Sequence, residues 1–134
     1  MEVCYSNREY FIKEKINGQT YLMAFSNWDG TDKTEYFNIS LQVMSKRKHA
    51  DAEMDNVVTT GKNPYATIDF AIKAFKILEE HVLKKYPSKK IILHCHWTDN
   101  RRRNIYEHFL TKKGYQFGYV GNKRCLMKVR KPIK

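Results

Sequence analysis

The chain lacks most of what marks secreted, zinc-stabilised or membrane-spanning proteins. Its 134 residues include only three cysteines, none in a Cys-x-x-Cys pair, so neither a disulfide framework nor a structural zinc site is expected. The longest apolar runs, such as residues 91–93, are far shorter than the roughly 18 residues of a membrane span. The N-terminus also lacks the features of a signal peptide. These absences predict a cytoplasmic protein without a membrane partner.

Acidic residues are scarce relative to basic ones. The chain has 25 lysines and arginines but only 14 aspartates and glutamates, for a formal net charge of +11. Such an excess makes the surface potential positive and favours phosphate-bearing or acidic partners. A polyanion, a nucleic acid, a nucleotide cofactor or an acidic protein therefore fits the composition. No RNP-type or helix-turn-helix signature is present, so direct reading of a base sequence is not predicted.

Length and patterning predict a single domain over residues 1–134, because 42% hydrophobic content can fill one core and the chain is too short for two. Asn17-Gly18 lies between the β-rich runs 9–16 and 19–26, which predicts a hairpin. Alternating apolar and polar residues over 36–46 predict a further strand with one buried face.

The rest of the chain alternates helical and strand patterns. Apolar residues recur at helical spacing over 66–85, and residues 90–97 suit a buried strand that lies parallel to strand 36–46 through the helical crossover. A second helix is expected over 100–112. The face of the first helix that is predicted to be buried contains Ile68, Ala71, Ile72, Phe75, Leu78 and Val82.

A closing hairpin is expected from strands 115–120 and 124–130, on either side of Gly121-Asn122. The order of elements is then β-β-β-α-β-α-β-β. This is an α/β (α+β) fold whose mixed, mostly antiparallel sheet has one parallel strand pair.

Two helix starts have the composition of anion sites. Gly61, Lys62 and Asn63 precede the first helix, where free amides, the helix dipole and an ammonium converge; the alternative is an ordinary glycine-containing loop with a good cap. Three arginines from Arg101 to Arg103 lie in the first turn of the second helix, where cations oppose the dipole. A bound phosphate would compensate for this, whereas the alternative is three solvated arginines.

His94 and His96 are two residues apart on the expected strand 90–97, so both side chains are predicted to point to one face. Histidines in this arrangement can act as a general base or bind a metal. No third ligand is identifiable, so we expect no metal here. The alternative is a pair of packed, hydrogen-bonded histidines.

Aromatic residues crowd the opening hairpin and are interleaved with Arg8, Lys13 and Lys15. They could stack on bases beside phosphate contacts, or simply fill the strands as aromatic residues often do. The residues concerned are Tyr5, Tyr10, Phe11, Tyr21, Phe25 and Trp28.

The order of elements, with Asp99, Tyr106 and the pair Gly114-Tyr115 at their spacing, resembles the C-terminal two-thirds of the GNAT family of N-acetyltransferases over roughly residues 36–130. The resemblance implies acetyl-CoA or another acyl-CoA as cofactor. It also implies that Tyr106 protonates the departing thiolate. The base would be His94, His96 or a carboxylate of the polar loop 46–60, such as Asp51 or Glu53. The residues that the resemblance assigns to the cofactor are Thr60, Gly61, Lys62, Asn63, Ala66, Asp99 and Arg101.

The cofactor loop departs from the family pattern. Val58 stands where the family has Arg or Gln, Asn63 replaces a small residue, and Pro64 removes one amide donor. A hairpin also replaces the family's first two helices. Two hypotheses follow from this: an acyl-CoA-dependent N-acyltransferase, or a non-catalytic GNAT-like module whose basic surface binds nucleic acid or an acidic protein, as a small regulatory or viral protein would. Tyr106 under the second hypothesis simply packs with its helical neighbours.

Overall fold

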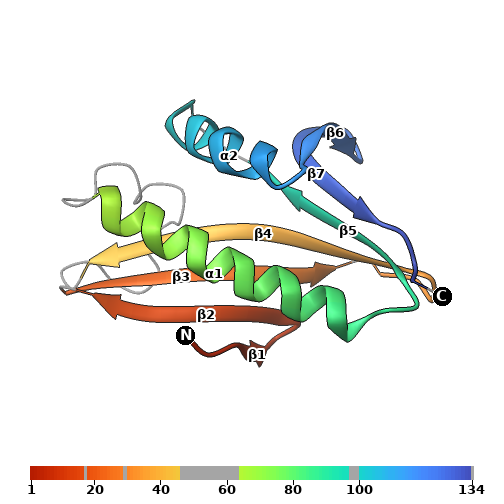
Figure 1. Ribbon diagram of the computed structural model, residues 1–134, viewed down its shortest axis with the longest axis horizontal. Helices are drawn as coiled ribbons and strands as arrows, with labels where there is room; N and C mark the ends of the chain where they lie inside the picture. Colours follow the sequence, from red (N-terminus) through yellow and green to blue (C-terminus); the bar gives the residue numbers. More distant parts are fainter. Residues whose placement is uncertain (17, 29, 46–63, 97–99, 134) are drawn as a thin grey trace.

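The computed structural model describes residues 1–16, 18–28, 30–45, 64–96 and 100–133, and the side chains at 44, 45, 64, 65, 100–103, 105 and 106 lie outside this description. The described residues form two helices and one seven-stranded sheet (Figure 1). No helix among them is long and apolar enough to cross a membrane.

The sheet confirms the predicted fold class and order of elements. Its strands lie in the order β1-β2-β3-β4-β5-β7-β6, and every neighbouring pair is antiparallel except β4 and β5, which are parallel. The elements are β1 Cys4–Ser6, β2 Glu9–Ile16, β3 Gln19–Trp28, β4 Thr34–Ser45, α1 Pro64–Lys85, β5 Lys90–Cys95, α2 Asn100–Lys112, β6 Gln116–Val120 and β7 Lys123–Arg130.

Sequence patterning missed β1. This strand has three residues and forms a tight hairpin with β2, in which Ser6 pairs with Glu9. Asn7 and Arg8 form the turn with positive φ angles of 49° and 64°. Such a turn normally contains glycine, and Arg8 in its place removes the usual sequence signal. The next hairpin keeps that signal, since Gly18 has a φ of 82°.

The parallel pair β4–β5 is short. It runs from Thr34 beside Lys90 to Ile39 beside Cys95, where β5 ends, whereas β4 continues to Ser45. Figure 1 shows the two strands diverging toward these C-terminal ends. Residues 40–45 of β4 therefore have no strand partner on the β5 side among the described residues.

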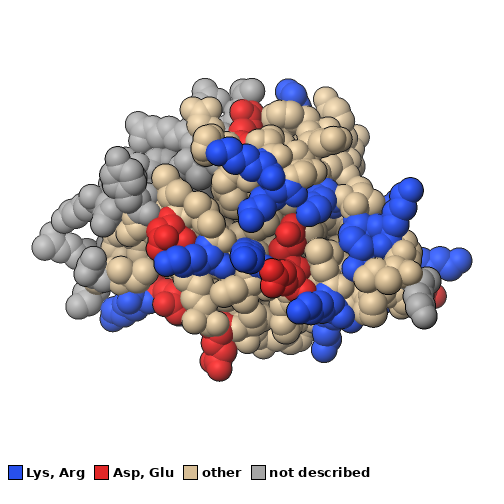
Figure 2. Space-filling view, viewed as in Figure 1, with Lys and Arg blue, Asp and Glu red and all other residues tan. Residues whose placement is uncertain are grey.

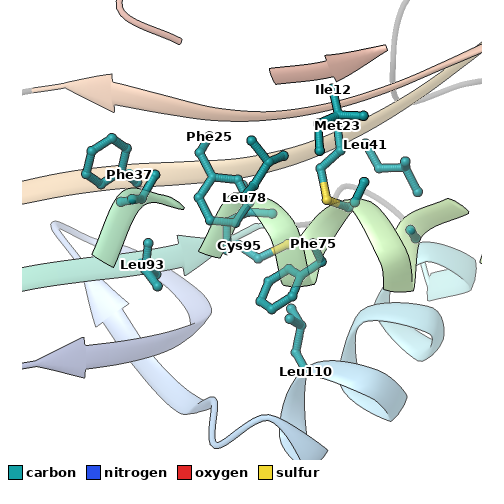
Figure 3. Packing of buried hydrophobic residues seen from close by; sticks show 14 of the residues in the cluster. Ile12, Met23, Phe25, Phe37, Leu41, Phe75, Leu78, Leu93, Cys95 and Leu110 are labelled. Carbon is teal, nitrogen blue, oxygen red and sulfur yellow. The ribbon is translucent and has the colours of Figure 1, made fainter. Parts of the chain in front are cut away.

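Both helices pack against one face of the sheet and share one core. Phe75 of α1 is at its centre, with its ring 5.7 Å from that of Phe25, 5.3 Å from that of Phe109 and 5.6 Å from that of Tyr115. Figure 3 shows Phe75 between the sheet and Leu110 of α2. The opposite face of the sheet is covered by no helix of the described residues.

The buried stripe of α1 differs from the predicted one. Ile68 and Ile72, which the helical spacing assigned to the core, are exposed, whereas Phe70 and Ala74 are buried. Phe70 packs its ring on Tyr21 of β3, with centroids 5.4 Å apart. The large aromatic ring thus sets the rotation of the helix on the sheet.

The aromatic residues of the opening strands divide between two roles. Tyr10, Tyr21 and Phe25 are buried in the core and cannot stack on a base, so strand filling is the correct interpretation for them. Tyr5 and Trp28 are exposed.

Arg130 of β7 holds the C-terminal end of α1 to the sheet. Its guanidinium donates hydrogen bonds to the carbonyls of Leu83 (3.0 Å), Lys89 (2.9 Å) and Tyr86. These carbonyls lie in the last turn of α1 and just beyond it, where helical carbonyls lack partners and the dipole favours a cation.

Replacing Arg130→Ala should lower the free energy of unfolding by about 2–4 kcal/mol, because several charge-assisted hydrogen bonds are lost together. Arg130→Lys should recover only part of this, since an ammonium lacks the planar fork. The measurement is urea unfolding. Lys131→Ala, which removes an exposed neighbouring charge, is the control. Equal effects of Arg130→Ala and Lys131→Ala would contradict the capping role.

Candidate functional site

The candidate site lies at the end of the sheet where the parallel strands β4 and β5 finish. Ligands of open sheets with parallel strands bind beyond the carboxyl ends of those strands. Helix α1 follows β4 in the chain and α2 follows β5, so the N-termini of both helices lie toward this end of the sheet (Figure 1). His94 and His96 stand at the end of β5.

A chain of hydrogen bonds runs through the two histidines. The indole Nε1–H of Trp28 lies 2.9 Å from Nε2 of His94, and Nδ1 of His94 lies 3.0 Å from Nε2 of His96. An indole can only donate, so Nε2 of His94 accepts and its proton is on Nδ1. His94 therefore donates to Nε2 of His96, which in its neutral form has its own proton on Nδ1.

Both histidines have lowered pKa values. Burial, followed by the neighbouring His96, lowers the pKa of His94 to about 4. The pKa of His96 is lowered by burial and by the charge of Lys123, while the backbone of Arg124 acts in the opposite direction. Both rings are therefore neutral at pH 7.

The hydrogen-bond chain divides the roles of the two histidines. His94 is 1% exposed and uses both ring nitrogens, which confirms the packed, hydrogen-bonded interpretation for this residue. It has no lone pair left to accept a substrate proton in this arrangement. His96 is half-buried, and among the described residues its buried Nδ1 has no partner within strict hydrogen-bond geometry, although the backbone of Arg124 interacts with this ring. His96 Nδ1 is thus the donor at the end of the chain.

A second unsatisfied polar group lies in the first turn of α1. The hydroxyl of Thr67 has no hydrogen-bond partner among the described residues, although the side chain is only 2% exposed. Its neighbour Ala66, one of the predicted cofactor residues, is partly buried against the core. An unpaired buried hydroxyl costs free energy unless a ligand or a water satisfies it.

Most of the other predicted site residues cannot be related to this geometry. Arg101 and Tyr106 lie in α2, but their side chains are outside the description. The remaining positions, namely Thr60, Gly61, Lys62, Asn63, Asp99, Asp51 and Glu53, are outside the described residues altogether. Among the described residues no three His, Cys, Asp or Glu side chains form a group that could hold a metal ion.

Two site residues were not predicted from the sequence. Trp28 is 66 positions from His94 in the chain, so no local pattern connects them. Thr67 was missed because the predicted buried face of α1 was rotated. Thr67 lies three residues before Phe70 and four before Ala71, so it belongs to the face of α1 that is buried in the structure. A polar residue on a buried helix face would have marked it as a candidate site residue.

Comparison with protein-family models, curated proteins and solved structures yields no significant match to this chain.

Acid should destabilise the fold through His94. Its pKa of about 4 is below the ordinary 6.5, so the unfolded chain binds the proton first as the pH falls. The free energy of unfolding should therefore decrease from about pH 6.5 to about pH 4, by about 3 kcal/mol from this residue. Urea unfolding at several pH values measures this.

The variant His94→Gln should remove that part of the pH dependence. His108→Gln is the matched control, because His108 is exposed on α2 and its loss should leave the wild-type slope unchanged. The same slope in His94→Gln as in wild type would refute the assignment of a buried neutral histidine.

Proposed function

We propose that the protein is a GNAT-like N-acyltransferase that uses acetyl-CoA or another acyl-CoA. The observation that carries this proposal is the order of elements around one parallel strand pair. The pairing of these two strands stops at the end of the sheet where both helix N-termini and the histidine pair lie. The order of elements agrees with the order implied by the resemblance of residues 36–130. Two of the four buried polar atoms that have no hydrogen-bond partner among the described residues, Thr67 Oγ1 and His96 Nδ1, add local support at this end of the sheet.

The cofactor would be bound at the start of α1. Its pyrophosphate would be bound by Thr60, Gly61, Lys62 and Asn63, with Ala66 in the first helical turn, because free amides and the helix dipole favour an anion there. Asp99 and Arg101 would complete the site from the start of α2. Residues 40–45 of β4, which have no partner on the β5 side within the described part of the chain, suit an extended arm that contains amide groups, since such an arm can bond to an unpaired strand edge.

The chemistry would use a hydrogen-bond donor, an acid and a base. In the transfer the substrate amine attacks the thioester carbon, the new C–N bond forms, the C–S bond breaks, and the amine loses a proton. Tyr106 would protonate the departing thiolate. Because Nδ1 of His96 carries a proton, this residue is suited to donate a hydrogen bond to the carbonyl oxygen as it becomes negative. His94 and Trp28 would position it, and the base would be a carboxylate such as Asp51 or Glu53.

Acetyl-CoA should raise the melting temperature of the protein, since a ligand that binds only the folded state stabilises it. Thr67→Val should weaken this binding about 5- to 10-fold, as loss of one hydrogen bond does. Without ligand the same variant should be equally stable or more stable by about 1 kcal/mol, because a buried unsatisfied hydroxyl is removed. Calorimetric titration and urea unfolding are the two measurements.

The control is Thr111→Val. Thr111 is exposed on α2, and its hydroxyl bonds the carbonyl of Glu107 in the same helix, so its replacement should not affect cofactor binding. No stabilisation by acetyl-CoA, propionyl-CoA or free coenzyme A would overturn the proposed enzyme.

A second candidate function is a non-catalytic basic module that binds nucleic acid or an acidic protein. It is favoured by the distribution of charge along the chain. Eleven of the 25 lysines and arginines lie in residues 100–134, together with only one of the 14 acidic residues, Glu107. Eleven cations against one anion give this segment +10 of the total +11. Figure 2 shows mixed charges over α1 and mainly basic ones toward the C-terminal end.

A further inference from the structure

Edge strand β6 presents an unusual pair of aromatic side chains. Tyr119 is 67% exposed and Phe117 is 41% exposed, and both lie on the same face of the strand because they are two residues apart. The guanidinium carbon of Arg124 lies 4.4 Å from the centroid of the Phe117 ring. Arg124 is also the cross-strand partner of Tyr119. We call these three residues the β6 platform.

The platform contributes little to the core. Among the described strands β6 pairs only with β7, and the core includes neither Phe117 nor Tyr119. Folding therefore leaves the Tyr119 ring largely in water and the Phe117 ring partly exposed beside a cation. Tyr5, the exposed aromatic residue of the opposite edge strand β1, instead packs its ring on Tyr10 at 4.6 Å. An exposed aromatic pair of this kind is a marker of a binding surface.

A polar groove adjoins the platform. It has a volume of about 350 Å³ and runs between α2 and β6, so that the Phe117 ring forms one wall. The other lining residues share one face of α2 and provide amide, carboxylate, imidazole and hydroxyl groups: Asn104, Glu107, His108 and Thr111. Such a set contains both donors and acceptors, which is what the edge of an unpaired base requires.

We propose that the β6 platform and its groove bind single-stranded nucleic acid, with bases stacked on Phe117 and Tyr119 and phosphates beside Lys123 and Arg124. The inference rests on the second proposed function and specifies its surface and partner. Base stacking explains the rings, the groove accepts base edges, and the +10 segment attracts the backbone. An acidic protein would use the cations but has no bases to stack on the two rings. A duplex would hide the faces of its bases.

The test is fluorescence anisotropy of the full chain with labelled single-stranded RNA and DNA of about 12 nucleotides. Tyr119→Ala should weaken binding about 5- to 100-fold, as loss of one stacked base does. Tyr119→Phe, which keeps the ring, should retain wild-type affinity. Arg124→Ala should also weaken binding and should reduce the slope of log K against log salt by about 1.

Matched controls use the other half of the molecule. Tyr5→Ala removes an exposed aromatic residue from the opposite sheet edge, and Lys76→Ala removes an exposed cation from α1; both should bind as wild type does. If the control variants weaken binding as much as the platform variants do, the β6 platform is not the binding site, and only the proposal of a basic module remains. Equal affinity for duplex or for polyglutamate would overturn the choice of single-stranded nucleic acid. No binding of oligonucleotide, heparin or polyglutamate at about 50 mM salt would refute the basic module as well.

Discussion

The short parallel pairing of β4 and β5 is the constraint on which the rest of the molecule depends. Two parallel strands need a crossover, which here includes α1, and the core forms where that helix covers the sheet. Because the pairing stops at Ile39 and Cys95, the strands separate at the end where both helix N-termini lie. The same geometry produces one continuous core and, among the described residues, leaves β4 unpaired on its β5 side beyond Ile39.

His94 is a polar side chain that is buried at this end of the sheet without an unpaired ring nitrogen. Burying an imidazole is tolerable when the ring is neutral and its nitrogens are bonded, and Trp28 and His96 satisfy both nitrogens of His94. Since each bond in the chain fixes the tautomer of the next ring, Trp28 determines which nitrogen of His96 carries a proton. A tryptophan at the end of β3 thus fixes the protonated nitrogen of both imidazoles at the end of β5.

The histidine pair at the end of β5 interacts electrostatically with the hairpin of β6 and β7. Lys123 lowers the pKa of His96, and the backbone of the adjacent Arg124 acts on the same ring in the opposite direction. A polyanion that screened Lys123 would therefore raise the pKa of His96. His96 of the first proposed site and Lys123 and Arg124 of the second are therefore close neighbours in the structure.

Local patterns in the sequence were sufficient to determine most of the fold, because strand alternation, helical spacing and turn residues are properties of neighbouring positions. They identified both helices, the parallel pair and two hairpins, and they put His94 and His96 side by side. The turn at Asn7-Arg8 contains no glycine, so the sequence patterns did not predict β1. Only tertiary packing decided the rest. The packing of Phe70 on Tyr21 sets the rotation of α1 and places Thr67 in the interior. The hydrogen bond between Trp28 and His94 joins residues 66 positions apart. The pairing of the strands brings such distant residues together, and no periodic pattern in the sequence records it.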